Sequence, residues 1–412
     1  MFLLITAHCS LLAVFTGCTG DHAAKKDIKA IPWTTYLFNQ ERDGKTEDAF
    51  APPPDIVSDF RISRGIRFFP IYDPRQYSSP AIVDNVVYVG SADKYFYAIN
   101  LIKGKGIWEF ETSGAVESSP TVADGRVYFG ANDGKLYCLD VKDGREIWHF
   151  QAHTEIISSP VVEGGVVYFN SADDKLYALK AENGEKLWQY SRGYVKRTVK
   201  RMFASPAAYG NKIYYNFSDG RLVAIEKSSG REIWSRKIGG FSEMWGSGSD
   251  AVIVRFTPTI DNGLVYIIDG DGFIIALDAE SGSEKWRFDI IKSSDFAINR
   301  DSIFIAGYDG RIIAIKKESG DILWRRRVSH GVPASLVIAD KYLIIASNYK
   351  SESFFSSSMG SLLDIFDMDK GKKIWSETID STTSTSLSAA YNHLFFITDK
   401  GHLRIYKSRT QD

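Results

Sequence analysis

A glycine followed four residues later by tryptophan recurs seven times in this chain of 412 residues. The pairs are Gly104/Trp108, Gly144/Trp148, Gly184/Trp188, Gly230/Trp234, Gly282/Trp286, Gly320/Trp324 and Gly371/Trp375. Successive glycines are 40, 40, 46, 52, 38 and 51 residues apart, and seven of the nine tryptophans fall in this register. A motif that returns at such intervals predicts a repeat protein with loops of variable length. Because repeated units can extend one domain, a single domain can account for the whole length.

Each unit has the pattern of four short strands joined by tight turns. In the second unit these strands fall near residues 118–123, 126–130, 135–140 and 146–150, with Asp124-Gly125 and Asp133-Gly134 between them. Asp-Gly between β-forming runs is typical of a hairpin, because glycine accepts the positive φ that the turn needs. We name the strands A to D in chain order. The motif glycine then supplies the turn between C and D, and the tryptophan packs between neighbouring units.

Eight units begin with Ser-Ser-Pro or a related sequence, but the last one ends at a strand C near residues 402–407. Its strand D is expected at the N-terminus, over residues 60–69, where Phe69 follows Gly65 in the register of the tryptophans. Pairing of the two ends would close a ring and cover the edge of that strand C. The sequence therefore predicts an all-β, eight-bladed β-propeller of four-stranded antiparallel blades over residues 60–408. Eight aromatic residues are expected to dock neighbouring blades: Phe69, Trp108, Trp148, Trp188, Trp234, Trp286, Trp324 and Trp375.

The first residues resemble a lipoprotein signal. Residues 2–17 are mostly apolar, which is short for a membrane-spanning helix but typical of a signal peptide. They end in Phe15-Thr16-Gly17-Cys18, which is similar to the bacterial lipobox, so Cys18 is expected to be lipidated after cleavage. An uncleaved anchor or an ordinary secretory signal is the alternative. Residues 18–59 would then form the lipid anchor and a tether.

Composition argues against several classes of function. Lys and Arg total 50 and Asp and Glu total 51, so no overall charge favours nucleic acid or an anionic membrane. Apart from Cys18 and Cys9, which lies inside the signal, the only cysteine is Cys138. It takes a position that alanine holds in five other units, which predicts a small buried side chain and not a nucleophile. No hydrolase elbow, phosphate loop or metal-spaced histidine cluster is present, so neither a catalytic site nor a cofactor or metal site is predicted.

The pattern Ala-x-Asp-x3-Gly-x3-Trp, complete at Ala276, Asp278, Gly282 and Trp286, resembles the repeat of the pyrroloquinoline-quinone propeller superfamily over about residues 60–408. With its lipobox, eight units and compact length, the chain is most similar to the BamB family of lipoproteins. This resemblance implies a non-enzymatic scaffold of outer-membrane β-barrel assembly, anchored at the periplasmic face of the outer membrane. Its implied partner is a BamA-like protein, with nascent outer-membrane proteins as a further candidate.

Two other functions remain open at this point. Quinoprotein dehydrogenases of the same superfamily hold quinone and calcium in the central funnel, and typically carry an adjacent Cys-Cys pair that this chain lacks. The other alternative is a periplasmic adaptor or sensor propeller with an unrelated protein partner.

Three unusually long connections are expected on one face, because D-to-A and B-to-C connections of such a blade emerge on the same side. They span residues 190–203, 238–255 and 348–360, and the last carries Phe354 and Phe355. Candidate partner-binding residues on the first two are Arg192, Lys196, Arg197, Lys200, Arg201, Phe241 and Trp245. The cations could pair with an acidic partner, and the resemblance implies that Arg201 corresponds to an arginine with which BamB binds BamA. The alternatives are a solvated basic loop and a second loop that folds back into the central channel.

Overall fold

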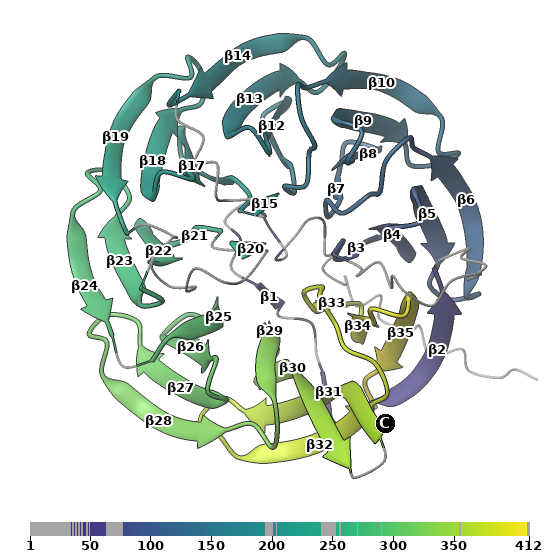
Figure 1. The fold of residues 1–412 in the computed structure, drawn as a ribbon, viewed down its shortest axis with the longest axis vertical. Coiled ribbons are helices and arrows are strands. Elements are labelled where there is room, and N and C mark those ends of the chain that lie inside the picture. The colour runs from purple at the N-terminus through teal and green to yellow at the C-terminus, as the bar shows by residue number, and fades with distance from the viewer. Residues whose placement is uncertain are drawn as a thin grey trace, which may run out of the picture.

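The computed structural model describes residues 34, 37, 39, 42, 44–46, 48, 50–62, 77–193, 201–202, 204–239, 253–254, 257–269, 271–289, 291–353 and 356–409. Within these residues the chain forms eight blades of four antiparallel strands, arranged in a ring (Figure 1). The described part contains no helix, and thus none long and apolar enough to cross a membrane. The predicted eight-bladed propeller is confirmed.

Seven blades are continuous in sequence, and their strands run A to D from the centre of the ring outward. Blades 1 to 3 comprise β3 (Ala81–Val83), β4 (Val86–Gly90), β5 (Tyr95–Asn100) and β6 (Lys105–Glu111); β7 (Thr121–Ala123), β8 (Arg126–Gly130), β9 (Lys135–Asp140) and β10 (Glu146–Gln151); and β11 (Val161–Glu163), β12 (Val166–Ser171), β13 (Lys175–Lys180) and β14 (Lys186–Ser191). Blades 4 and 5 comprise β16 (Ala207–Tyr209), β17 (Lys212–Asn216), β18 (Arg221–Glu226) and β19 (Glu232–Lys237); and β21 (Thr259–Asp261), β22 (Leu264–Ile268), β23 (Ile274–Asp278) and β24 (Glu284–Phe288). Blades 6 and 7 comprise β25 (Ser293–Ile298), β26 (Ser302–Gly307), β27 (Arg311–Lys316) and β28 (Ile322–Arg327); and β29 (Val332–Ala339), β30 (Tyr342–Ser353), β31 (Ser356–Asp367) and β32 (Lys373–Ile379).

Blade 8 joins both ends of the described chain. Its inner strands are β33 (Ser388–Ala390), β34 (His393–Ile397) and β35 (His402–Lys407), and its outer strand is β2 (Asp55–Arg61), antiparallel to β35. Closure by an N-terminal strand is therefore confirmed.

The predicted place of the closing strand, residues 60–69, was wrong, because β2 ends at Arg61. Ser58 lies opposite Ile405, where other blades have their tryptophan, as Trp148 lies opposite Cys138. This strand thus carries no Gly-x3-aromatic motif, and a search for that motif could not find it. Phe69 itself lies outside the described residues.

Six indoles lie against the C-to-D turn of the next blade. Each Nε1 donates to a carbonyl of that turn at 2.7–3.1 Å, from Trp108, Trp148, Trp188, Trp234, Trp286 and Trp324. At five of these six turns the motif glycine leaves room for the ring, as a Cβ on Gly144 would lie 2.5 Å from Cε3 of Trp108. The exception is Gly320, where nothing lies within 4 Å of an added Cβ. At the closure Phe60 takes this place, since a Cβ on Gly104 would lie 2.4 Å from its Cζ. The remaining indole, Trp375, meets Tyr406 edge-on at 6.3 Å.

Several described residues that precede β2 contact the inner strands of the ring, although this segment was expected in the tether. β1 (Lys45–Thr46) pairs in parallel with β29, and Figure 1 shows it near the centre. The Val122 amide of blade 2 donates to the carbonyl of Thr34 at 2.8 Å. Phe50 is buried among residues of blades 1, 7 and 8. The inner edges of several A strands are thus covered by the chain's own N-terminal residues.

Candidate partner-binding face and central channel

The two long D-to-A connections meet each other near the axis of the ring. The first contains β15 (Arg201–Met202) and the second β20 (Ile253–Val254), and the two strands pair in parallel, with Arg201 opposite Ile253. Figure 1 shows both strands near the axis of the ring. Two-residue strands carry no periodic signal, so the sequence could not predict this pairing. It brings the connection with the basic cluster together with the one that carries the aromatic residues.

The third long connection is a hairpin and not a loop. β30 and β31 remain paired from Tyr342 opposite Asp367 to Ser353 opposite Ser356, so the segment 348–360 extends the blade. The long connection expected there is therefore made of two extended strands, whose backbone groups are satisfied by pairing with each other. Phe354 and Phe355, at its tip, lie outside the described residues.

Arg192 is held within the molecule. Its Nε lies 2.8 Å from Oδ2 of Asp219 and its Nη1 lies 3.0 Å from Oε2 of Glu232, both in blade 4. The side chain is 22% exposed, so these carboxylates and not solvent are its main partners. Arg192 therefore positions the start of the first connection. Of the other candidates, Arg201 is described only through its backbone in β15, and Lys196, Arg197, Lys200, Phe241 and Trp245 lie outside the described residues.

A buried carboxylate lies beside this ion pair. Asp174, at the B-to-C turn of blade 3, accepts hydrogen bonds from the amide and hydroxyl of Ser218 at 3.0 and 2.8 Å. Burial raises the pKa of Asp174 to about 6, because the bonds from Ser218 only partly offset the loss of hydration. This contact ties blade 3 to blade 4. Sequence reasoning missed it, since an Asp-Asp pair in a turn has an ordinary local explanation.

The central channel is crossed by a buried arginine. Arg42 is 1% exposed, and its guanidinium donates to the carbonyls of Ser159, Pro160 and Pro206 at 3.0, 3.1 and 3.3 Å. Its own carbonyl accepts from Oγ1 of Thr259 at 3.0 Å. One residue of the N-terminal segment thus links blades 3, 4 and 5 at the start of their A strands.

These residues do not fit the metal ion that the superfamily's dehydrogenases hold in their central funnel. The channel-facing carbonyls of blades 3 and 4 are bonded to Arg42, whose positive charge would repel a metal ion. Among the residues that the structure describes, no group of three or more His, Cys, Asp or Glu side chains could hold a metal.

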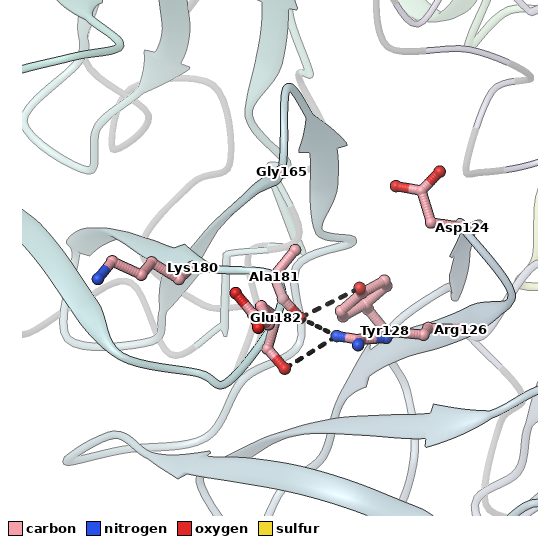
Figure 2. Close-up of a pocket in the computed structure, with 7 residues that line it drawn as sticks. All are labelled: Asp124, Arg126, Tyr128, Gly165, Lys180, Ala181 and Glu182. Carbon is pink, nitrogen blue, oxygen red and sulfur yellow. Dashed lines mark hydrogen bonds between the residues drawn. The ribbon is translucent and has the colours of Figure 1, made fainter.

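A cavity of about 360 Å³ opens between blades 2 and 3, on the side of the A-to-B and C-to-D turns (Figure 2). Its lining residues are Asp124, Arg126, Tyr128, Gly165, Lys180, Ala181 and Glu182. Arg126 donates from Nη1 to the carbonyls of Ala181 and Glu182 at 2.6 and 2.9 Å. The neighbouring Cys138 is buried, which raises the pKa of its thiol to about 12. The cavity therefore offers neither a thiolate nor an uncommitted guanidinium.

Eight antiparallel blades with repeated Gly-x3-Trp docking define a β-propeller of the pyrroloquinoline-quinone-like repeat class. The family model described as "Outer membrane protein assembly factor BamB" matches residues 71–156, 130–276 and 270–410. The chain therefore belongs to the BamB family. No curated protein matches it in sequence.

Solved structures share the fold at low identity. BamB from Moraxella catarrhalis is 18% identical with a TM-score of 0.69, over 86% of this chain and 99% of that one. Quinohemoprotein alcohol dehydrogenase from Comamonas testosteroni is 14% identical with a TM-score of 0.67, over 93% and 82% of the two chains. A europium-containing methanol dehydrogenase is 13% identical with a TM-score of 0.66, over 90% and 88%. At these identities the similarity shows the fold alone.

Proposed function

We propose that this chain is a non-enzymatic, lipid-anchored scaffold of outer-membrane β-barrel assembly that binds a BamA-like protein through its long-connection face. We place it at the periplasmic face of the outer membrane, anchored through Cys18. The observation that carries the proposal is the pairing of β15 with β20, which brings the two long connections together. Membership in the BamB family supports the same function.

The filled centre of the ring supports the proposal that the protein has no enzymatic activity. A quinoprotein dehydrogenase needs an open funnel for its cofactor and substrate, whereas Arg42 and β1 lie in the centre of this ring. The buried guanidinium is bonded to three carbonyls from two blades, so opening the channel would leave those acceptors unpaired.

In this proposal Lys196, Arg197, Lys200 and Arg201 provide the cations for an acidic partner surface, and Phe241 and Trp245 provide apolar anchors. Aromatic and arginine side chains dominate the energy of many protein interfaces. Arg192 does not contact the partner, because it is bonded to Asp219 and Glu232 and holds the base of the first connection.

Co-purification from native membranes after crosslinking tests the proposal. Arg201→Glu should strongly reduce recovery of the endogenous barrel-assembly protein, because it reverses a charge at the joined connections. Lys142→Glu is the matched control, since Lys142 is exposed on a C-to-D turn at the opposite face. Equal recovery with wild type and Arg201→Glu would refute the site, and failure to recover any barrel-assembly protein would refute the function.

A further inference from the structure

The outer strand of blade 6 has an open edge. Among the described strands, β28 pairs with β27 alone. Its sequence ends in three consecutive arginines, Arg325, Arg326 and Arg327, and begins with the exposed apolar residues Ile322 and Leu323. An unpaired edge of this kind can accept a strand from another chain.

The backbone groups of Arg325 and Arg327 point toward that open edge. Val328 and Gly310 lie opposite each other, and the Val328 amide donates to the Gly310 carbonyl at 3.0 Å. These two residues therefore form a hydrogen-bonded pair. Such pairs alternate along an antiparallel ladder. In the register of β27 and β28, with Arg311 opposite Arg327, the hydrogen-bonded positions are therefore 328, 326 and 324. Residues 325 and 327 therefore have outward-facing amides and carbonyls, of which the Arg325 carbonyl accepts from Nη1 of Arg326 at 2.7 Å.

The same two residues carry exposed positive charges, and that of Arg327 helps to lower the pKa of Asp309. Arg326 faces blade 7, where its Nε and Nη2 donate to the carbonyls of Gly371 and Lys370 at 2.8 and 2.6 Å. Arg325 and Arg327 are exposed, and neither forms an ion pair with a described carboxylate, whereas the nearby Arg311 is paired with Asp309. Arg325 and Arg327 thus combine exposed charges with outward backbone groups, of which the two amides and the Arg327 carbonyl have no hydrogen bond within the described blade.

No other described outer strand carries two cations at the residues whose backbone groups face outward. The positions one and three residues after the tryptophan, or after Ser58 in β2, carry two cations only in β28. In the other outer strands these pairs are Asp59/Arg61, Glu109/Glu111, His149/Gln151, Gln189/Ser191, Ser235/Lys237, Arg287/Asp289 and Ser376/Thr378. Since the chain has a net charge of −1, the positive edge is a local feature.

We propose that the outer edge of blade 6 binds an extended acidic segment of a protein partner, which adds to β28 as a further strand. The segment's backbone would bond to the outward amides of residues 325 and 327 and to the carbonyl of residue 327, and acidic side chains at alternate positions would pair with the two guanidinium groups. The outward backbone groups favour a polypeptide over a nucleic acid or a lipid headgroup, because only a strand supplies matching donors and acceptors. This site is separate from the long-connection face and does not depend on its proposed function.

A labelled ten-residue peptide with Glu alternating with Val and Thr is the probe, measured by fluorescence anisotropy. Arg325→Glu/Arg327→Glu should weaken its binding about tenfold or more, since two charge-assisted contacts become repulsive. Lys142→Glu/Arg145→Glu, which makes the same charge change on an exposed turn, should leave binding within about twofold. Methylation of every second peptide amide should also weaken binding about tenfold, because it blocks strand addition. Arg201→Glu should retain full peptide binding, which separates this proposal from the previous one.

Three outcomes would overturn the proposal. Equal losses of peptide affinity in the two double variants would show that the peptide responds to the overall charge of the protein and not to this edge. Undiminished binding of the methylated peptide would show a charged patch without strand addition. Self-association of the wild-type protein in light scattering, lost in Arg325→Glu/Arg327→Glu, would make a second copy of the chain the occupant. Circular dichroism of each variant establishes that it is folded.

Discussion

Replacing Gly144 with alanine should destabilise the propeller more than the same change at Gly125, although both glycines have a φ of +72°. An alanine in this left-handed conformation costs about 1–2 kcal/mol at either position. At Gly125 nothing lies within 4 Å of the added Cβ, so no further cost is expected. At Gly144 the Cβ would lie 2.5 Å from Cε3 and 2.6 Å from Cδ2 of Trp108. Overpacking of this kind adds about 1–3 kcal/mol.

The free energy of unfolding measured in urea, followed by tryptophan fluorescence and far-ultraviolet circular dichroism, tests the difference. Gly144→Ala should lose about 2–5 kcal/mol and Gly125→Ala about 1–2 kcal/mol. In a Trp108→Ala background, which itself loses about 3–5 kcal/mol, the excess cost at Gly144 should vanish, because the ring it overlaps is gone. Equal losses for the two glycines, or an excess that persists without Trp108, would refute the docking of ring on glycine.

Three further results are expected from the buried polar and thiol groups. Asp174→Asn should raise the free energy of unfolding at pH 8 by up to about 3 kcal/mol and at pH 4 by less than about 1, as measured by urea unfolding. The sign follows from the raised pKa: the native state of the wild type binds the proton more tightly, a stabilisation present below about pH 4 and lost as the pH rises through about 6. A gain in the free energy of unfolding that is equal at pH 4 and pH 8 would contradict the raised pKa as its cause. Arg42→Ala should lower the free energy of unfolding by about 3 kcal/mol, since the carbonyls of Ser159, Pro160 and Pro206 lose their donor. A melting temperature equal to that of the wild type would contradict it. Cys138 should remain unmodified by a thiol reagent at pH 8 until the protein unfolds, because burial raises the pKa of its thiol to about 12; rapid labelling of the native protein would contradict the burial.

Local signals sufficed for the blades because each blade repeats the same short-range pattern. The Asp-Gly turns and the Gly-x3-Trp register specify where strands begin and end, as in blade 2 between Thr121 and Gln151. The closing strand lacks that register, with Ser58 in place of tryptophan, so its position depended on pairing with β35 and was predicted several residues too late.

The candidate site was predictable only in part. The face that carries the long connections follows from the order of strands in a meander. The engagement of Arg192 by Asp219 and Glu232 does not, because these residues are 27 and 40 positions away and meet only when blade 3 packs on blade 4. For the same reason, the sequence did not predict the hydrogen bond between Asp174 and Ser218, which are 44 positions apart.

By itself, the sequence determined the class of fold and the number of blades, because tight turns and docking aromatics are encoded within each unit. It also predicted closure by an N-terminal strand, because the last unit lacks a strand D of its own. The tertiary structure alone decided what fills the centre and what joins the long connections. Arg42 lies 117 residues from Ser159 and 164 from Pro206, and β15 meets β20 across an entire blade. Such contacts leave no periodic trace in the chain, since they arise where surfaces from distant repeats converge on the axis of the ring.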